Sequence, residues 1–75
     1  MKSHKLIALE LRNIRTSLGI TQEKLALDAG LDRTYVQSIE TGKRNISIDV
    51  FFRLCEALEV NAHDVIRKTS IKSKK

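Results

Sequence analysis

The fold is set by residues 19–45, GITQEKLALDAGLDRTYVQSIETGKRN, which contain two helix-length segments separated by a glycine. Thr21 and Asp32 stand at N-cap positions, each just before a segment whose apolar residues have helical spacing. Gly30 and Gly42 follow the two segments, where a left-handed residue commonly ends a helix. The pattern therefore predicts two short helices, over about 21–29 and 33–41, joined by a tight turn.

The second of these segments carries few apolar residues. Val36 and Ile39 point inward, and Tyr35 lies on a flank. With residues about 100° apart, the opposite face collects hydrogen-bonding side chains, with Arg33 near its N-terminal edge: Thr34, Gln37, Ser38 and Thr41. Such a face suits a helix in the DNA major groove, where Arg can bond guanine and Gln can bond adenine. An ordinary solvated helix face explains the same pattern, so periodicity alone leaves both interpretations open.

Three further amphipathic segments flank this pair. The first, a helix over about residues 5–17, has one apolar stripe at helical spacing: Ile7, Leu11, Ile14 and Leu18. The next, over 47–58 with Ser47 as N-cap, has another: Phe51, Leu54, Cys55 and Leu58. A short fifth helix begins after Asn61, which is its N-cap. Since no useful segment alternates with period two, we expect an all-α, compact bundle of five short helices.

Charge is distributed unevenly along the chain. The 75 residues include 14 Lys and Arg and 9 Asp and Glu, a net charge of +5. Residues 67–75 hold five of the basic residues and no acidic one, which leaves nine of each sign in residues 1–66. We therefore expect one helix-turn-helix domain over 1–66 and a basic flexible tail over 67–75. The tail is either a solubilising end or an arm that touches phosphates.

Several classes of protein do not fit this sequence. A single cysteine excludes an internal disulfide, and the inner stripe places Cys55 in the core as an inert thiol. No apolar run approaches the ~18 residues of a membrane span, and no signal peptide is present, so we expect a cytoplasmic protein. His4 and His63 lack partners at metal-ligand spacing. We expect no enzyme activity, metal, cofactor or small-molecule ligand.

Leu11 to Ile48 resembles the Cro/CI-type, or XRE-type, helix-turn-helix domain, a lambda-repressor-like DNA-binding fold. The resemblance covers about Ile7 to Ile66 and is most specific at GITQEKLA (19–26) and IETGKR (39–44). Within that family, DRTYV (32–36) and GKRN (42–45) are most similar to the controller proteins of restriction–modification systems. The resemblance implies a sequence-specific regulator of transcription that binds double-stranded DNA.

The resemblance also implies roles for matching positions. Residues of the second helix of the pair would read base edges: Arg33, Thr34 and Gln37. A second set would hold DNA phosphates: Gln22, Ser38, Lys43, Arg44 and Asn45. Arg15 and Glu40 match a pair that forms a buried salt bridge. Glu59 and Ile46 stand where the family often has Gly and Pro, so we expect backbone strain at Glu59 if its φ is positive.

A domain this small has little spare stability, so we expect a homodimer on a palindromic operator. The expected interface lies around the last two helices: Phe52, Ala62, Val65 and Ile66. RNA polymerase is a further candidate partner. The alternative function is a protein-interaction module, such as an antitoxin that uses the same fold to bind another protein.

Overall fold

The computed structural model describes residues 3–74 and the side chains of residues 5–69. That part of the chain contains no strand, and its helices are α1 (Ser3–Ser17), α2 (Gln22–Ala29), α3 (Arg33–Glu40), α4 (Ile48–Leu58) and α5 (Ala62–Lys74). The predicted all-α, five-helix fold is confirmed. None of these helices is both long enough and apolar enough to cross a membrane.

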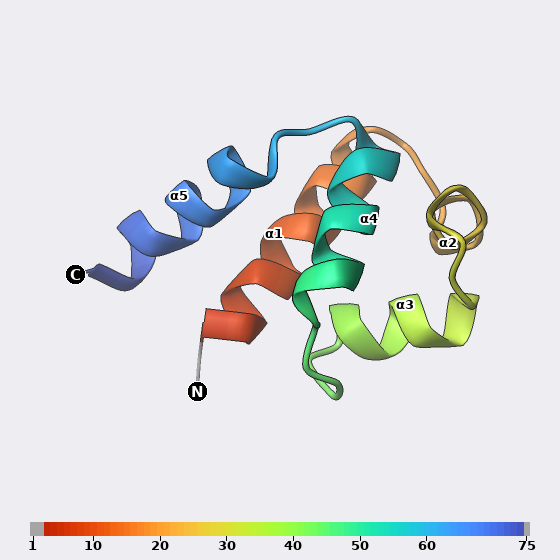
Figure 1. Cartoon of the computed structure of the whole chain (residues 1–75), viewed down its shortest axis with the longest axis horizontal. Helices are drawn as coiled ribbons and strands as arrows, with labels where there is room; N and C mark the ends of the chain where they lie inside the picture. Colours follow the sequence, from red (N-terminus) through yellow and green to blue (C-terminus); the bar gives the residue numbers. More distant parts are fainter. Residues whose placement is uncertain (1–2, 75) are drawn as a thin grey trace.

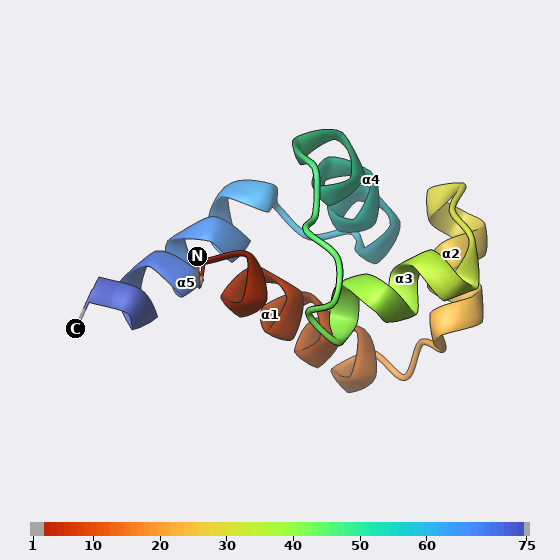
Figure 2. The same cartoon turned by 90° about the horizontal axis from the view of Figure 1, so that it is seen from below.

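Helices α1 and α4 lie side by side in the middle of the molecule, between α5 on one side and α2 and α3 on the other (Figures 1 and 2). Helix α5 packs mainly on α1, whereas α2 packs on both α3 and α4. Helix α3 runs along one edge of the molecule, below α4 in Figure 1. The long middle helices thus support the short α2–α3 pair from behind.

Three of the four predicted N-caps, at Thr21, Ser47 and Asn61, form the expected bonds, and Asn61 Oδ1 accepts from the His63 backbone N–H at 2.8 Å. Thr21 Oγ1 accepts a hydrogen bond from the Lys24 backbone N–H at 3.0 Å, and Ser47 Oγ accepts one from Val50 at 3.2 Å. Asp32 has the extended backbone of an N-cap, but its side chain makes no capping bond to α3. The prediction for Asp32 is therefore right about position and wrong about the side-chain bond. Gly30, with φ +71°, makes the left-handed turn between α2 and α3.

The core draws on all five helices. Its buried apolar residues are Ala8, Leu11, Leu25, Ala26, Ala29, Val36, Ile39, Val50, Phe51, Leu54, Cys55, Leu58 and Val65. Leu18 is a correction, because it is 54% exposed. Helix α1 ends at Ser17, so Leu18 lies in the following turn, where helical spacing no longer sets the direction of a side chain. Ala8 is buried instead, one residue after the predicted stripe begins.

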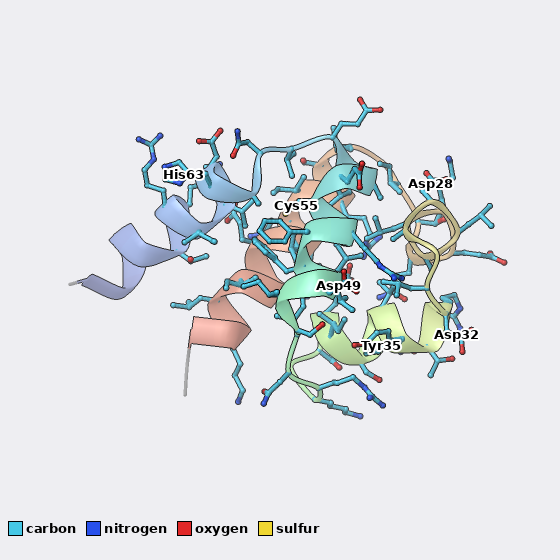
Figure 3. All side chains as sticks on the ribbon, in the orientation of Figure 1. Asp28, Asp32, Tyr35, Asp49, Cys55 and His63 are labelled. Carbon is cyan, nitrogen blue, oxygen red and sulfur yellow. The ribbon has the colours of Figure 1, made fainter. Side chains whose placement is uncertain are left out.

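Cys55 lies on the inner side of α4 and is buried, as expected (Figure 3). Desolvation by burial raises the pKa of its thiol from 9.0 to about 11. The thiol is therefore protonated at neutral pH, which suits a residue that packs rather than reacts.

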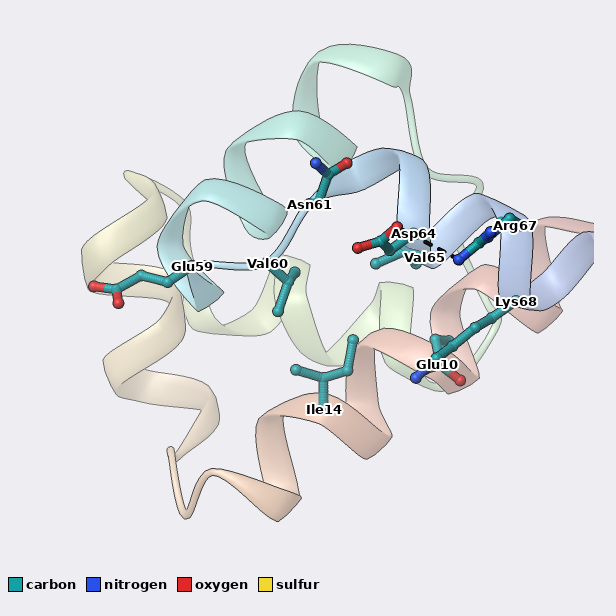
Figure 4. Close-up of a pocket in the computed structure, with 9 residues that line it drawn as sticks. All are labelled: Glu10, Ile14, Glu59, Val60, Asn61, Asp64, Val65, Arg67 and Lys68. Carbon is teal, nitrogen blue, oxygen red and sulfur yellow. Dashed lines mark ion pairs between the residues drawn. The ribbon is translucent and has the colours of Figure 1, made fainter.

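Helix α5 is longer than the sequence indicated. Residues 67–74, expected in a flexible tail, continue the helix. Thr69 is buried four residues after Val65, so it extends the apolar side, and its hydroxyl donates to the Ile66 carbonyl at 2.8 Å. Lys68 Nζ lies 3.5 Å from a carboxylate oxygen of Glu10 on α1 (Figure 4). The tail lysine side chains at positions 72, 74 and 75 lie outside the described residues.

A shallow groove separates the start of α5 from α1. Ile14, Val60 and Val65 form its apolar wall, while Glu10, Asp64 and Lys68 supply charge (Figure 4). Glu59 lies at its edge, in the link between α4 and α5, with φ 59° and ψ 42°. Among the described residues it is the only one other than glycine with positive φ, which agrees with the expectation of strain there.

Candidate nucleic-acid interface

Helix α3 has one anchored side and one free side. Val36 and Ile39 are fully buried and fix the helix against the core. Arg33, Thr34 and Gln37, expected to read bases, are all exposed. Because the anchored and free sides belong to one short rigid helix, the backbone positions of these three residues are defined relative to the core. The geometry is that of an element held from behind and presented to a partner.

Behind α3, Arg15 and Glu40 form the expected buried ion pair. Arg15 Nε donates to Glu40 Oε2 at 2.8 Å, and Arg15 Nη2 donates to Oε1 at 3.0 Å. The Glu40 side chain is 4% exposed. Arg15 Nη1 also donates to the Ile20 carbonyl at 2.7 Å, so one guanidinium ties the end of α1, the link to α2 and the end of α3. Bidentate, charge-assisted bonds of this kind are among the stronger polar contacts in proteins.

Gln22, expected to meet a phosphate, already has two protein partners. Its Nε2 donates to Glu40 Oε1 at 3.0 Å, and its Oε1 accepts from Arg33 Nη1 at 3.5 Å. An amide nitrogen carries two hydrogens, so one N–H of Gln22 is still available to a phosphate. The side chain thus connects the buried ion pair to the exposed end of α3, a link that no pattern in the sequence predicts.

The loop after α3 places three predicted phosphate-binding side chains in solvent: Lys43, Arg44 and Asn45. Gly42, with φ +79°, turns the chain, and the N–H groups of the next two residues donate to the Ser38 carbonyl at 3.0 and 3.3 Å. Ser38 itself is half-buried. The loop is therefore bonded to the last turn of α3, so the backbone that carries its cations has a fixed relation to the exposed side of the helix.

Two residues outside the predicted site, Tyr35 and Lys5, lie beside this loop. The Arg44 guanidinium carbon is 5.0 Å from the ring centroid of Tyr35, which Figure 3 shows on α3. This cation–π contact holds a side chain that would otherwise be free. Lys5 of α1 runs past Gly42, with its Cγ 3.6 Å from where a β-carbon would sit. Both contacts depend on the chain reversal at Gly42, and no spacing in the sequence predicts them.

The residues expected at a dimer interface do not share one environment. Phe52 is 52% exposed and Ile66 is 42% exposed, while Ala62 is half-buried. Val65 is a correction, because it is 2% exposed and packs in the core of the single chain. Its position one turn before Thr69 directs it toward α1, so it has almost no surface left to offer a partner. Among the described residues, no group of three His, Cys, Asp or Glu side chains could hold a metal ion.

Comparison with known proteins agrees with this geometry. Residues 11–65 match the helix-turn-helix family. The chain is 40% identical over 67 residues to control protein C.BamHI of Bacillus amyloliquefaciens, covering 88% of this chain and 83% of the relative. It is 29% identical over 73 residues to control protein C.SmaI of Serratia marcescens, covering 97% and 87%.

Solved structures of controller proteins are also similar to this chain. The restriction–modification controller protein C.AhdI of Aeromonas hydrophila superposes with a TM-score of 0.81 at 35% identity, over 87% of this chain and 98% of that one. The wild-type controller protein C.Esp1396I superposes with a TM-score of 0.83 at 30% identity, over 92% of each chain. The chain therefore belongs to the helix-turn-helix family of Cro/CI-type transcriptional regulators, among which the controller proteins of restriction–modification systems are its relatives.

Proposed function

We propose that the protein is a controller-type transcriptional regulator that acts in the cytoplasm as a dimer on a palindromic operator in double-stranded DNA. The observation that carries this proposal is the division of α3, whose apolar residues Val36 and Ile39 are fully buried while Arg33, Thr34 and Gln37 face solvent. The relatives are control proteins and regulators, which supports regulation over the alternative of an antitoxin-like interaction module.

Within the interface, we assign base reading and phosphate binding to different elements. Arg33 lies in the first turn of α3 and can reach a guanine edge, with Thr34 and Gln37 on the same exposed side. Lys43, Arg44 and Asn45 lie beyond the helix, where the chain would run beside the DNA backbone. Ser38 and the second amide hydrogen of Gln22 would add phosphate contacts. Phosphate contacts position the protein and carry no direct sequence information.

The operator follows from twofold symmetry. Two copies of α3 in a dimer require half-sites about 34 Å apart, one turn of B-DNA from centre to centre. Phe52 and Ile66 remain exposed after folding and are the residues best placed to bury surface between two copies. Regulation would then depend on protein concentration through dimer formation, without a small-molecule effector, and RNA polymerase is the partner through which a bound regulator would act.

The experiment compares Arg33→Ala with Lys43→Ala. Three duplexes are used: one enriched from a random pool by the wild-type protein, a set of single-substituted versions, and a random sequence. Arg33→Ala is expected to cost about 1–3 kcal/mol on the enriched duplex and to relax preference at one base pair. Lys43→Ala is expected to weaken all duplexes by similar factors and to lower the salt slope by about one unit.

Titrations at several salt concentrations separate the two roles. If Arg33→Ala lost affinity equally on all three kinds of duplex, Arg33 would be a backbone contact and the assignment of the reading face would be wrong. Lys43→Ala serves as the matched control, since it also removes a cation from the interface but stands outside α3.

A further inference from the structure

The buried carboxylate of Glu40 accepts a hydrogen bond from Gln22 in addition to its ion pair with Arg15. Its Oε1 accepts hydrogen bonds from both Arg15 Nη2 and Gln22 Nε2, each at 3.0 Å, while its Oε2 accepts from Arg15 Nε at 2.8 Å. Three donors from two helices thus converge on one side chain of α3 that is 4% exposed. The Arg15 bonds alone would join α1 to α3, so the bond from Gln22 needs a separate account.

The chemistry of that bond fixes the orientation of the Gln22 amide. An ionised carboxylate offers only acceptors, so the side-chain nitrogen of Gln22 must face Glu40. The carbonyl oxygen then has to point the other way, toward the surface. There it accepts from Arg33 Nη1 at 3.5 Å. Glu40 therefore determines that Arg33 meets the oxygen end of the Gln22 amide. That oxygen is an acceptor, which suits a guanidinium because a guanidinium only donates.

This arrangement matters because Arg33 is exposed and has many rotamers. Ordering a long side chain on binding costs conformational entropy, and a neighbouring acceptor reduces that cost by restricting the guanidinium in advance. We propose that Glu40 is a positioning residue for base reading, acting on Arg33 through the oriented amide of Gln22. The inference rests on the proposed function, in which Arg33 reads a base.

The test is Gln22→Met, which keeps the length of the side chain and leaves the Arg15–Glu40 bonds in place. Its readout is the ratio of affinities for the enriched duplex and for the duplex substituted at the base pair where Arg33→Ala relaxes preference. That ratio is expected to fall about threefold to tenfold, as for loss of one coupled neighbour. A lost phosphate contact alone would weaken both duplexes equally and leave the ratio unchanged, as Lys43→Ala is expected to do.

A double-mutant cycle identifies the route of the effect. In the Arg33→Ala background, Gln22→Met is expected to leave the ratio unchanged, because there is no guanidinium left to position. A ratio that is unchanged by Gln22→Met in the wild-type background would overturn the proposal. So would an equal fall in both backgrounds. Circular dichroism of each variant checks that the folded fraction is the same in every titration.

Glu40→Gln gives a second measurement, made below its melting temperature. The neutral amide can accept from or donate to Gln22, so the orientation is no longer imposed, and the ratio is expected to fall as for Gln22→Met. An unchanged ratio in a folded Glu40→Gln protein would overturn the role of the carboxylate. If Arg33→Ala itself lost no base preference, the proposed reading role would fail, and that result is distinct from a failure confined to Gln22 and Glu40.

Discussion

Glu59 occupies left-handed backbone, with φ 59° and ψ 42°, at the end of α4. A side chain with a β-carbon is strained there, whereas glycine is not. Glu59→Gly is expected to raise the free energy of unfolding by about 0.5–1 kcal/mol, since relief of strain exceeds the entropy that glycine adds to the unfolded chain. Urea unfolding checks this as a higher midpoint with an unchanged slope.

Glu59→Ala is the matched control, because it removes the carboxylate and keeps the β-carbon. It is expected to give no such gain. Equal stabilisation by Gly and Ala would mean that charge, not backbone geometry, limits stability at this position.

Single residues differ in how far the sequence predicts their surroundings. Arg15 and Glu40 were expected to pair because they match a known motif, and the structure contains that pair. The inward bond of Gln22 could not be predicted, since nothing in a sequence states which end of an amide faces which neighbour. The contact between Tyr35 and Arg44 was missed for a related reason, because a chain reversal creates it. The sequence identifies which residues form the ion pair, but the orientations of the Gln22 and Arg44 side chains follow only from the fold.

At the scale of helices, the N-caps of α2, α3 and α4 make a matched series. Thr21 and Ser47 accept backbone hydrogen bonds, whereas Asp32 does not. Thr21→Ala and Ser47→Ala are each expected to lower the free energy of unfolding by about 1 kcal/mol. Asp32→Ala is expected to cost about 0.5 kcal/mol or less, the part due to a negative charge at the start of α3.

Thermal unfolding of the three variants at low and high salt measures this difference. The loss for Asp32→Ala should shrink in high salt, since only an electrostatic term is at stake. A loss for Asp32→Ala as large as that for Thr21→Ala would contradict the cap geometry of α3.

Helix existence was predicted better than helix ends. Glycines and caps marked α2, α3 and the start of α4 closely, because each of these boundaries carries a residue with a specific backbone preference. Leu18 was misplaced because the helical period was extended past the true end of α1 at Ser17. Helix α5 was predicted too short because the basic residues after Ile66 masked a buried position at Thr69. A single apolar contact per turn gives a weak signal.

At the scale of the whole molecule, the expected dimer tests the exposed surface of α4. Phe52→Glu places a charge where a partner would bury an aromatic ring, and the monomer tolerates it because Phe52 is 52% exposed. It is expected to shift the protein to monomers at micromolar concentration and to weaken binding to a two-half-site operator. Sedimentation equilibrium measures the mass, with Leu27→Glu, an exposed position on α2, as control.

A wild-type protein that stayed monomeric with operator DNA present would contradict the dimer. A Phe52→Glu dimer as stable as the wild type would instead place the interface elsewhere. The sequence pattern does not separate core residues from interface residues, because both are apolar. Val65 shows this, since it fitted both descriptions until the packing of α5 on α1 was known.

Stability at alkaline pH depends on the buried thiol. The pKa of Cys55 is about 11 in the folded protein, against 9.0 as its ordinary value. Between these values the unfolded chain releases the proton and the folded chain keeps it, so the free energy of unfolding falls as pH rises from 9 to 11. Cys55→Ala is expected to show a shallower decline over that range in urea titrations. Parallel curves for the two proteins would contradict the raised pKa.

The same thiol is an intrinsic probe of core opening. Thiol reagents attack the thiolate, and a protonated sulfur buried on the inner side of α4 is out of their reach. The 75 residues contain one cysteine, so every adduct counts a single kind of event, the opening of the core. Mass spectrometry of labelled protein would time that opening without any engineered probe. Operator DNA binds the folded protein and favours the closed core, so the rate of thiol labelling would fall in proportion to the occupancy of the protein by DNA.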